Sequence, residues 1–425
     1  MTIAMNNYQQ ARRRRRAAPL ALLAAVASAI TLSIVIAGAP ARAATGTWAT
    51  ETIAGMSVRI YTPATQGTLG VGRALMINLH GCLQKAQNLQ DNGNWAATAD
   101  RTGMIIALPD APGGGVIAGC WDYYDSSHSS TAPTRHDDNL LDLATTMIGR
   151  TTLGIDRNQV YISGLSSGGG ETMVMGCLFP RIFAGIGINA GPTVGTNSSQ
   201  IGSVATTATT AASTCTNFAG SDSASFQTQL TSVIYGSNDA TVAPGYDTLN
   251  GEVMANIYGA STKTTFSLSG LPGTNTQGSG TLYSDSNGGR VSVIQNTGLG
   301  HNWPAGSGSG GSYISANSID YPSYLASFFF ANNRRVDRSG TPTPTPTTSP
   351  TPTPTATPSP TPTSTDCITA TNLEHKNAGR ATSYGINPYN PYYSAGLLGY
   401  MGQGDGTVSS LQRKTNGWTV ASSCS

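Results

Sequence analysis

The chain has 425 residues, only 10% of them charged, and a formal net charge of +2. This length allows one large catalytic-sized domain with an appendage. Five of the basic residues form a single run, Arg12 to Arg16. No basic face for nucleic acid and no acidic tail remains elsewhere, so a nucleic-acid partner is not expected. The few charges among many Ser, Thr, Asn and Gly residues favour a secreted protein over a cytosolic one.

The N-terminal segment has the pattern of an export signal. Arg12 to Arg16 supply a positive region, Ala17 to Gly38 are apolar, and Ala41-Arg42-Ala43 offers the small residues that a signal peptidase needs. We predict a signal peptide over residues 1–43 and a secreted, extracellular protein without membrane contact after its removal. An uncleaved anchor is the alternative, because the apolar run is nearly long enough to span a bilayer. The paired arginines leave twin-arginine export open.

The six cysteines of an exported chain indicate disulfides rather than a metal site. The sequence leaves their connectivity open, and pairing of neighbours along the chain is the simplest hypothesis. No CxxC or HxxxH spacing occurs, so we expect neither a metal nor another cofactor. Neighbour pairing would join Cys82 to Cys120, Cys177 to Cys215, and Cys367 to Cys424.

A proline-rich segment divides the mature chain. Thr341 to Thr365 alternates proline with threonine and serine, which removes helix and ladder hydrogen bonds and favours an extended rod. The chain then resumes with two cysteines, a tryptophan and several tyrosines, which argues against a disordered tail. We therefore predict a large catalytic-sized domain over residues 44–337, a linker over 338–365 and a second folded domain over 366–425.

Short apolar runs alternate with helix-like spacing in residues 44–337. Asp137 to Met147 has its leucines on one side and an acidic start that suits the helix dipole. This alternation predicts an α/β fold with a mostly parallel sheet, whose functional residues lie at the carboxyl edge of the strands. The predicted strands are 74–79, 104–108, 160–162, 186–188 and 232–235.

The stretch Gly164-Leu165-Ser166-Ser167-Gly168 fits the G-x-S-x-G nucleophile elbow. A predicted strand precedes it, and Glu171 to Leu178 can form a helix behind it. The flanking glycines leave room for the strained backbone of the serine. Ser166 is therefore the candidate nucleophile. A simple glycine-serine loop is the alternative in a chain with 51 glycines.

A nucleophilic serine needs a base, and we assign His301 in its glycine-flanked loop late in the domain. His128 and His136 precede the serine within polar sequence and are interpreted as surface or capping residues. His80 follows an early strand, and His375 lies beyond the linker.

The acid is assigned to Asp239, because it directly follows an apolar strand between the serine and the histidine. Asp222, Asp247 and Asp285 are rivals, but none of them directly follows such a strand. In this hypothesis the serine attacks, the histidine transfers the proton, and Asp239 fixes the imidazole tautomer.

The oxyanion requires two backbone donors. One comes from the residue after the nucleophile, here Ser167. The other usually comes from the loop after an early strand, which we assign to the N–H of Cys82. A bridge from Cys82 to Cys120 would hold that loop rigid, as a preorganised donor requires.

These motifs resemble the secreted poly(3-hydroxybutyrate) depolymerases that have a central lipase box. Leu79-His80-Gly81-Cys82, the elbow, the Asp239 loop and Gly300-His301-Asn302-Trp303-Pro304 are similar in order and spacing, and residues 372–381 are similar to the substrate-binding domain. The resemblance implies an α/β-hydrolase domain that cuts polyester through an acyl-enzyme, and a small β-rich binding domain. It nominates Trp303, His375 and Arg380 for substrate binding.

The expected partner is a solid polyester, and the enzyme is expected to be a monomer. The tethered binding domain would keep the catalytic domain close to the polymer surface. The catalytic motifs also occur in feruloyl and acetylxylan esterases, so a plant-wall ester is the alternative substrate. A non-catalytic polymer-binding protein is a third reading, against which the intact Ser166, Asp239 and His301 argue.

Overall fold

The computed structural model describes residues 45–124, 127–336, 338, 367–383, 391–395, 400–414, 417–421 and 423–424. The predicted signal peptide and the Thr/Pro-rich linker lie outside these described residues. They stay predictions, as do the domain boundaries.

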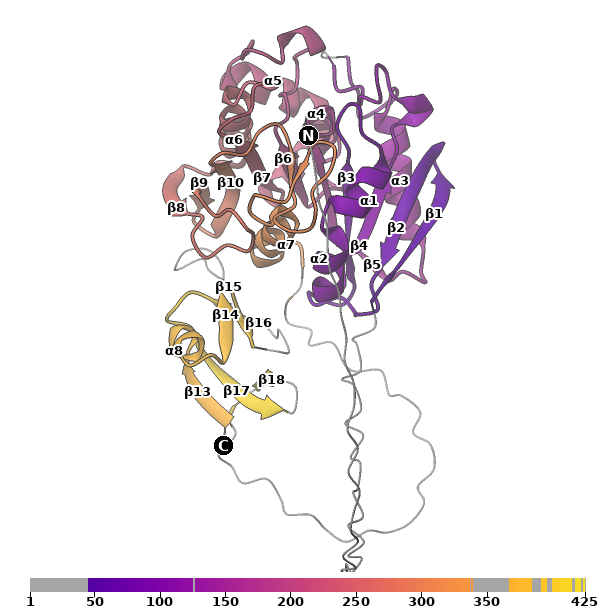
Figure 1. The fold of residues 1–425 in the computed structure, drawn as a ribbon. Coiled ribbons are helices and arrows are strands. Elements are labelled where there is room, and N and C mark those ends of the chain that lie inside the picture. The colour runs from indigo at the N-terminus through magenta and orange to yellow at the C-terminus, as the bar shows by residue number, and fades with distance from the viewer. Residues whose placement is uncertain are drawn as a thin grey trace, which may run out of the picture. The chain divides into compact units, whose positions relative to one another are not determined.

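A ten-stranded sheet forms the centre of the larger domain (Figure 1). Its strand order is β1-β2-β4-β3-β5-β6-β7-β10-β9-β8. The central strands pair in parallel: β4 (Ile105–Pro109), β3 (Arg73–Leu79), β5 (Ile155–Leu165), β6 (Gly185–Asn189), β7 (Leu230–Gly236) and β10 (Gly288–Asn296). Antiparallel strands extend both edges: β1 (Thr47–Ile53) with β2 (Met56–Thr62), and β9 (Gly278–Asp285) with β8 (Thr262–Ser267).

Two hydrophobic cores lie on opposite faces of this sheet, because side chains alternate along each strand. Leu75 and Ile77 of β3 belong to one core, and Met76 to the other. The first core also contains side chains of α3 (Asp137–Gly149), α4 (Ser167–Leu178), α5 (Ala208–Ala219) and α6 (Gly245–Tyr258). The second contains those of α1 (Ala86–Asn92), α2 (Trp95–Thr102) and α7 (Tyr321–Asn332).

The predicted α/β class is confirmed, and every predicted strand lies in the parallel centre of the sheet. These strands are covered on both faces, which makes their sequences continuously apolar and easy to detect. The strands that we did not predict include β1 and β8, which are mostly exposed. The helix after the serine begins at Ser167, not at Glu171 as predicted.

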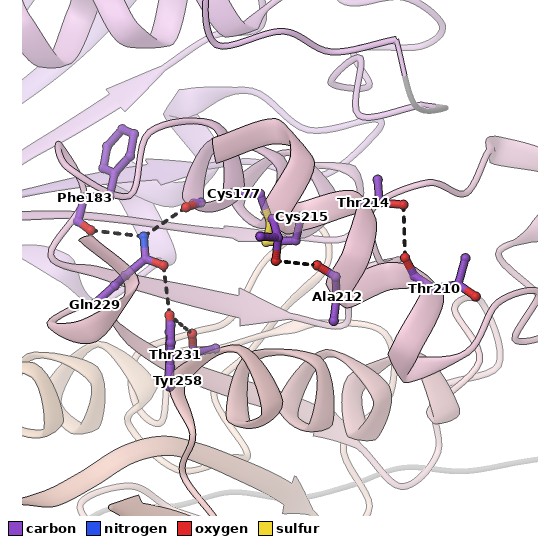
Figure 2. Close-up of a disulfide and its surroundings, with 11 residues drawn as sticks. Cys177, Phe183, Thr210, Ala212, Thr214, Cys215, Gln229, Thr231 and Tyr258 are labelled. Atoms are coloured by element: carbon purple, nitrogen blue, oxygen red, sulfur yellow. Dashed lines mark hydrogen bonds between the residues drawn. A yellow bond between two sulfur atoms is a disulfide. The ribbon is translucent and has the colours of Figure 1, made fainter. Parts of the chain in front are cut away.

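A disulfide fixes the helix that follows the serine. Cys177 on α4 is bonded to Cys215 on α5 (Figure 2). Nearby, the buried Gln229 amide donates to Gly176 O on α4 at 3.0 Å and accepts from the Tyr258 hydroxyl on α6 at 2.9 Å. α4 is thus tied to its neighbours covalently and by a satisfied polar group. The other bonds are Cys82–Cys120 and Cys367–Cys424, so the neighbour pairing is confirmed.

The C-terminal part is β-rich, as predicted. Its small core contains Ala381, Tyr392, Met401 and Leu411, with Trp418 packed against it. One sheet has the order β13 (Cys367–Thr371), β17 (Val408–Lys414), β18 (Gly417–Ala421), and the other β14 (Ala381–Ser383), β15 (Pro391–Ser394), β16 (Tyr400–Gln403). The helix α8 (Asn372–Asn377) follows β13.

Short elements complete the larger domain. They are η1 (Pro112–Gly114), η2 (Ser198–Gln200), η3 (Gly220–Gln227), β11 (Trp303–Pro304) and β12 (Ile314–Ser315). In the part of the chain that the structure describes, none of the helices is long and apolar enough to cross a membrane.

Asp285, at the end of β9, links two arginines. It accepts hydrogen bonds from Arg290 on β10 at 2.8 Å and from Arg334 after α7 at 2.7 Å. Partial burial raises its pKa, but the two guanidinium groups outweigh this and hold the pKa far below the usual range. The folded-state pKa is therefore below the unfolded-state value of about 3.9, and ionised Asp285 stabilises the fold above that pH.

We predict that Asp285→Asn lowers the free energy of unfolding at about pH 7 by about 2–3 kcal/mol, because charge-assisted bonds are lost and the buried Arg290 keeps its charge. The difference from the wild type shrinks as the pH falls below about 4, where the unfolded-state carboxyl is protonated. Thermal unfolding at both pH values checks this. Asp142→Asn, on the exposed side of α3, is the control and should change little. A pH-independent difference would contradict the assignment.

Candidate active site

Ser166 lies at the turn between β5 and α4 with φ 58° and ψ −119°. Non-glycine residues rarely adopt such a conformation, which costs on the order of 1–3 kcal/mol and often marks a functional site. The turn is held by two backbone hydrogen bonds. The Ser166 N–H donates to Asn189 O at 2.9 Å, and its carbonyl accepts from the Gly170 N–H at 2.9 Å. The predicted strand–serine–helix context is therefore present.

The glycines around the serine are required by close packing. A Cβ atom on Gly164 would lie 2.3 Å from Gly168 O, and one on Gly168 would lie 2.5 Å from His80 O. A Cβ atom on Gly170 would meet the ring of Tyr123 at 2.8 Å. The glycine run therefore lets the start of α4 lie directly against the end of β3.

His301 and Asp239 are joined by a hydrogen bond. Their Nδ1 and Oδ2 atoms lie 2.8 Å apart, and the side chains are 9% and 0% exposed. The other carboxylate oxygen of Asp239 accepts from the Thr241 N–H at 2.8 Å and the Val242 N–H at 3.1 Å. This carboxylate is therefore held in one orientation, with one oxygen directed at the imidazole.

The loops that carry these two residues follow neighbouring parallel strands. Asp239 comes after β7, and His301 comes after β10. The N–H of Asn238 donates to Leu299 O at 2.9 Å, which joins the loops directly. A Cβ atom on Gly236 would lie 1.9 Å from Leu299 O, so the loops meet at this glycine.

The rival acids have other partners or surroundings. Asp222 pairs with Arg181 at 3.2 Å, and Asp285 pairs with arginines at the sheet edge. Asp247 is buried in α6, where burial raises its pKa well above the usual range and the charge of Asp239 raises it further. The structure therefore places Asp239, among these four carboxylates, beside His301.

His128 and His136 are buried, so neither is a surface residue, but the capping alternative is confirmed for His136. His128 Nδ1 lies 2.7 Å from an oxygen of Asp137. His136 stands at the N-cap of α3, and its Nδ1 accepts from the Asp122 N–H at 3.1 Å. Close by in α4, burial and then the Asp137 charge raise the pKa of Glu171 well above its usual range.

The loop that contains Cys82 lies against the serine. A Cβ atom on Gly81 would be 3.3 Å from Ser166 Cβ. Cys82 is bonded to Cys120, and Leu83 N–H donates to Ala118 O at 2.7 Å. Within the described part of the chain, the Cys82 N–H has no hydrogen-bond acceptor.

The second assigned donor, Ser167, is the first residue of α4. The first N–H groups of a helix have no partner within it. Both assigned donors thus have the backbone setting that an oxyanion hole requires. Among the described residues, no group of three or more His, Cys, Asp or Glu is arranged to hold a metal ion.

His80 has a role that the sequence did not reveal. Its Nε2 accepts from the Ala111 N–H at 3.2 Å, so its Nδ1 carries the proton and donates to Gly81 O at 2.8 Å. Burial lowers its pKa, which keeps the imidazole neutral. His80 therefore fixes the carbonyl of the peptide bond whose N–H belongs to Cys82.

The prediction that Trp303 binds substrate is wrong. Its side chain is fully buried, and its indole N–H donates to Gly93 O at 3.1 Å. The ring packs against Trp95 and Tyr321, with centroid separations of 5.7 and 5.5 Å. Trp303 thus belongs to the core beside α2 and α7, and its side chain has no exposed surface for a substrate.

The prediction that His375 contacts polymer is also at odds with the structure. Its ring is fully buried, its Nε2 donates to Ser409 O at 3.0 Å, and its Nδ1 accepts from Arg380 Nε at 3.0 Å. Both nitrogens therefore serve the packing of the C-terminal domain. Arg380 is half-buried, with its guanidinium 5.9 Å from the centre of the Trp418 ring, and its role in binding stays a prediction.

Comparison with known proteins agrees with this site. The family model described as "Esterase PHB depolymerase" matches residues 56–258. The chain is 41% identical over 335 residues to the poly(3-hydroxybutyrate) depolymerase of Ralstonia pickettii, covering 76% of this chain and 67% of that protein. The chain belongs to the esterase PHB depolymerase family. The predicted resemblance is thereby confirmed, and this family member is a carboxylic ester hydrolase.

More distant relatives cover smaller shares of both chains. The poly(3-hydroxyalkanoate) depolymerase C of Paucimonas lemoignei is 27% identical over 60% of this chain and 63% of its own length. Acetylxylan esterase A of Aspergillus ficuum is 26% identical over 33% of this chain and 44% of its own length. The solved acetyl xylan esterase of Aspergillus awamori has a TM-score of 0.53 at 21% identity, and it covers 67% of this chain and 99% of that one. This similarity shows that the present chain has the same fold as that esterase.

We predict that Trp303→Phe lowers the free energy of unfolding by about 1–2 kcal/mol, because Gly93 O loses its buried donor and a void remains. The KM of the folded enzyme for a soluble ester should stay unchanged, since Trp303 does not reach substrate. Thermal unfolding and steady-state kinetics check both outcomes. Trp48→Phe is the control with the smaller loss, because Trp48 is only half-buried on the exposed edge strand β1. A raised KM with unchanged stability would restore the substrate-binding role.

Proposed function

We propose that this chain is a secreted serine esterase that hydrolyses the ester bonds of poly(3-hydroxybutyrate) or related short-chain polyhydroxyalkanoates. The observation that carries the proposal is the bonded pair of His301 and Asp239, on the same sheet edge as the strained Ser166. The substrate follows from the depolymerase of Ralstonia pickettii, which is 41% identical over most of this chain.

The chemistry divides into two acyl transfers. Ser166 Oγ attacks the ester carbonyl while His301 takes its proton, and the histidine then returns the proton to the leaving alcohol. Water attacks the resulting acyl-enzyme with the same base. Asp239 holds the imidazole with Nδ1 protonated and stabilises the imidazolium. The N–H groups of Cys82 and Ser167 stabilise the oxyanion of both tetrahedral intermediates.

The surface around the site suits an apolar polymer. Leu83 and Ile117 are exposed by 67% and 68%, on the two loops that the Cys82–Cys120 bond joins. Tyr313 is 38% exposed and meets the His301 ring edge-on, with 6.3 Å between centroids. Apolar side chains that stay exposed in this way favour contact with an apolar partner.

The C-terminal domain is proposed to adsorb to the solid substrate. Its described surface exposes Leu373, Val408 and Val420, by 40%, 63% and 38%. These groups suit the methyl-bearing face of a polyester, and Arg380 remains the candidate for its carbonyl groups. A solid polymer cannot diffuse into a pocket. A tethered binding domain therefore raises the local concentration of the enzyme at the polymer surface.

We also propose that the protein is secreted and monomeric. All six cysteines form disulfides, and such bonds persist in oxidising compartments. The pattern of residues 1–43 supports export. An acetylxylan-type activity is the second candidate, favoured by the similarity to the Aspergillus esterases. Loss of turbidity from a polyhydroxybutyrate suspension, compared with acetate or ferulate release from xylan, separates the two.

We predict that Ser166→Ala reduces kcat on a soluble ester by about a millionfold, because triad members act as a unit. Adsorption to polyhydroxybutyrate granules should be unchanged, since docking is assigned to the C-terminal domain. Ser203→Ala, on the surface, is the control. Substantial hydrolysis by the Ser166 variant would falsify the elbow assignment.

We predict that a chain ending before Asp366 keeps its kcat and KM on a short soluble ester, because the assigned triad and oxyanion donors all precede that residue. Its adsorption to polyhydroxybutyrate and its degradation of the solid should fall sharply. A depletion assay on granules, with cellulose and xylan as control solids, measures the adsorption. Equal depletion of the truncated and the full-length protein from solution by the granules would contradict the binding role of the C-terminal domain. Preferential depletion on xylan would favour the plant-wall substrate.

A further inference from the structure

Gln84 is a buried side chain whose polar ends are both used. It is 2% exposed and lies two residues before α1. Its Oε1 accepts from the Gly81 N–H at 2.8 Å, and its Nε2 donates to Ser312 O at 2.5 Å. A buried amide is costly unless it is hydrogen-bonded, so these two partners fix its position.

The two partners belong to the two halves of the proposed active site. Gly81 lies against Ser166 and precedes Cys82, the assigned oxyanion donor. Ser312 precedes Tyr313, whose ring packs edge-on against His301. The Gln84 side chain therefore joins the loop that contains Cys82 to the segment that packs against His301. Gln84 and Ser312 are 228 positions apart in the sequence.

Gly81 needs such an external constraint. A larger residue would be tightly packed there, because its Cβ would lie 3.3 Å from both Ser166 Cβ and Gln84 Oε1. Without a side chain, the glycine backbone is free to adopt many conformations. Gln84 accepts from the N–H of Gly81, and His80 donates to the carbonyl oxygen of the same residue. Together they restrict the rotations that orient the Cys82 N–H.

We propose that Gln84 is a positioning residue for ester hydrolysis, which holds the Cys82 N–H in the orientation that the oxyanion requires and keeps it in register with His301. This inference rests on the proposed function. Gln84 itself does not touch the substrate. Its effect lies in the transition state, because the oxyanion exists only there and its stabilisation depends on donors placed in advance.

Gln84→Met tests the proposal, because methionine has a similar length but can neither accept from Gly81 nor donate to Ser312. We expect kcat on a soluble ester to fall about tenfold to a hundredfold with KM nearly unchanged, since a misplaced donor costs less than an absent one. The affinity for an alkylboronic acid, which forms a tetrahedral adduct with serine, should fall by a similar factor. Rates are normalised to active sites counted from the pre-steady-state burst.

Gln84→Glu separates the two contacts. The carboxylate still accepts from the Gly81 N–H but does not donate to Ser312 O, so its loss of kcat should be smaller than that of Gln84→Met. Gln87→Met is the matched control. Its hydrogen bond to Asp91 lies on the surface of α1, and its kinetics should match the wild type.

A merely structural role predicts a different result. The melting temperature would fall while kcat per active site and boronic acid affinity stayed at wild-type values, and this outcome would overturn the proposal. If Gln84→Met does not fold, the same criteria apply to Gln84→Glu. Ser166→Ala in the same assay tests the proposed function separately: retained hydrolysis there means that the site itself is misassigned, whatever Gln84 does.

Discussion

The backbone of Ser166 is held in a strained conformation, and much of the catalytic domain is arranged to keep it there. The strain of about 1–3 kcal/mol persists only where surrounding structure over-determines it. Here the serine N–H is bonded to the end of β6, and its carbonyl is bonded within α4. α4 is buried along its whole length and covalently tied to α5 through Cys177. The sharp turn is therefore clamped from both sides.

This clamp explains the unusual composition of α4. Glycine lowers helix stability by about 1 kcal/mol per residue relative to alanine, yet three glycines follow Ser167 in sequence. The packing distances show why they are present, since Cβ atoms at Gly168 and Gly170 would collide with the end of β3 and with Tyr123. Tertiary contact, and not helix propensity, stabilises this helix. The loop that contains Cys82 also lies close to the serine at a glycine, Gly81.

The parts of the molecule that were predictable from sequence share a physical cause. Central strands are buried on both faces, so their apolar runs stand out, and the residues directly after them include Asp239 and the loop to Cys82. Parallel strands bring these positions to one edge, which is why Ser166 and the Asp239–His301 pair could be nominated from order and spacing alone.

The incorrect assignments of Trp303 and His375 concern side chains with partners that are distant in sequence. Nothing near Trp303 indicates that Trp95 packs against it, and nothing near His375 indicates that Ser409 accepts from its Nε2. Gln84 was overlooked for the same reason, since its second partner lies in a loop of the opposite half of the domain. An aromatic or polar residue beside a motif can equally well support the fold, and only tertiary contacts distinguish the two roles.

The bond between Cys82 and Cys120 has a consequence for where the enzyme matures. It closes the loop that presents the Cys82 N–H, and in a reducing cytosol both cysteines remain thiols. A chain that folded in such a compartment would lack this covalent link beside Ser166, and its loop would keep only its hydrogen bonds, among them those of Leu83 to Ala118 and of Gly81 to Gln84. In an oxidising compartment the disulfide persists and adds its constraint to these hydrogen bonds. The redox state of the compartment thus decides how firmly the loop beside the serine is held.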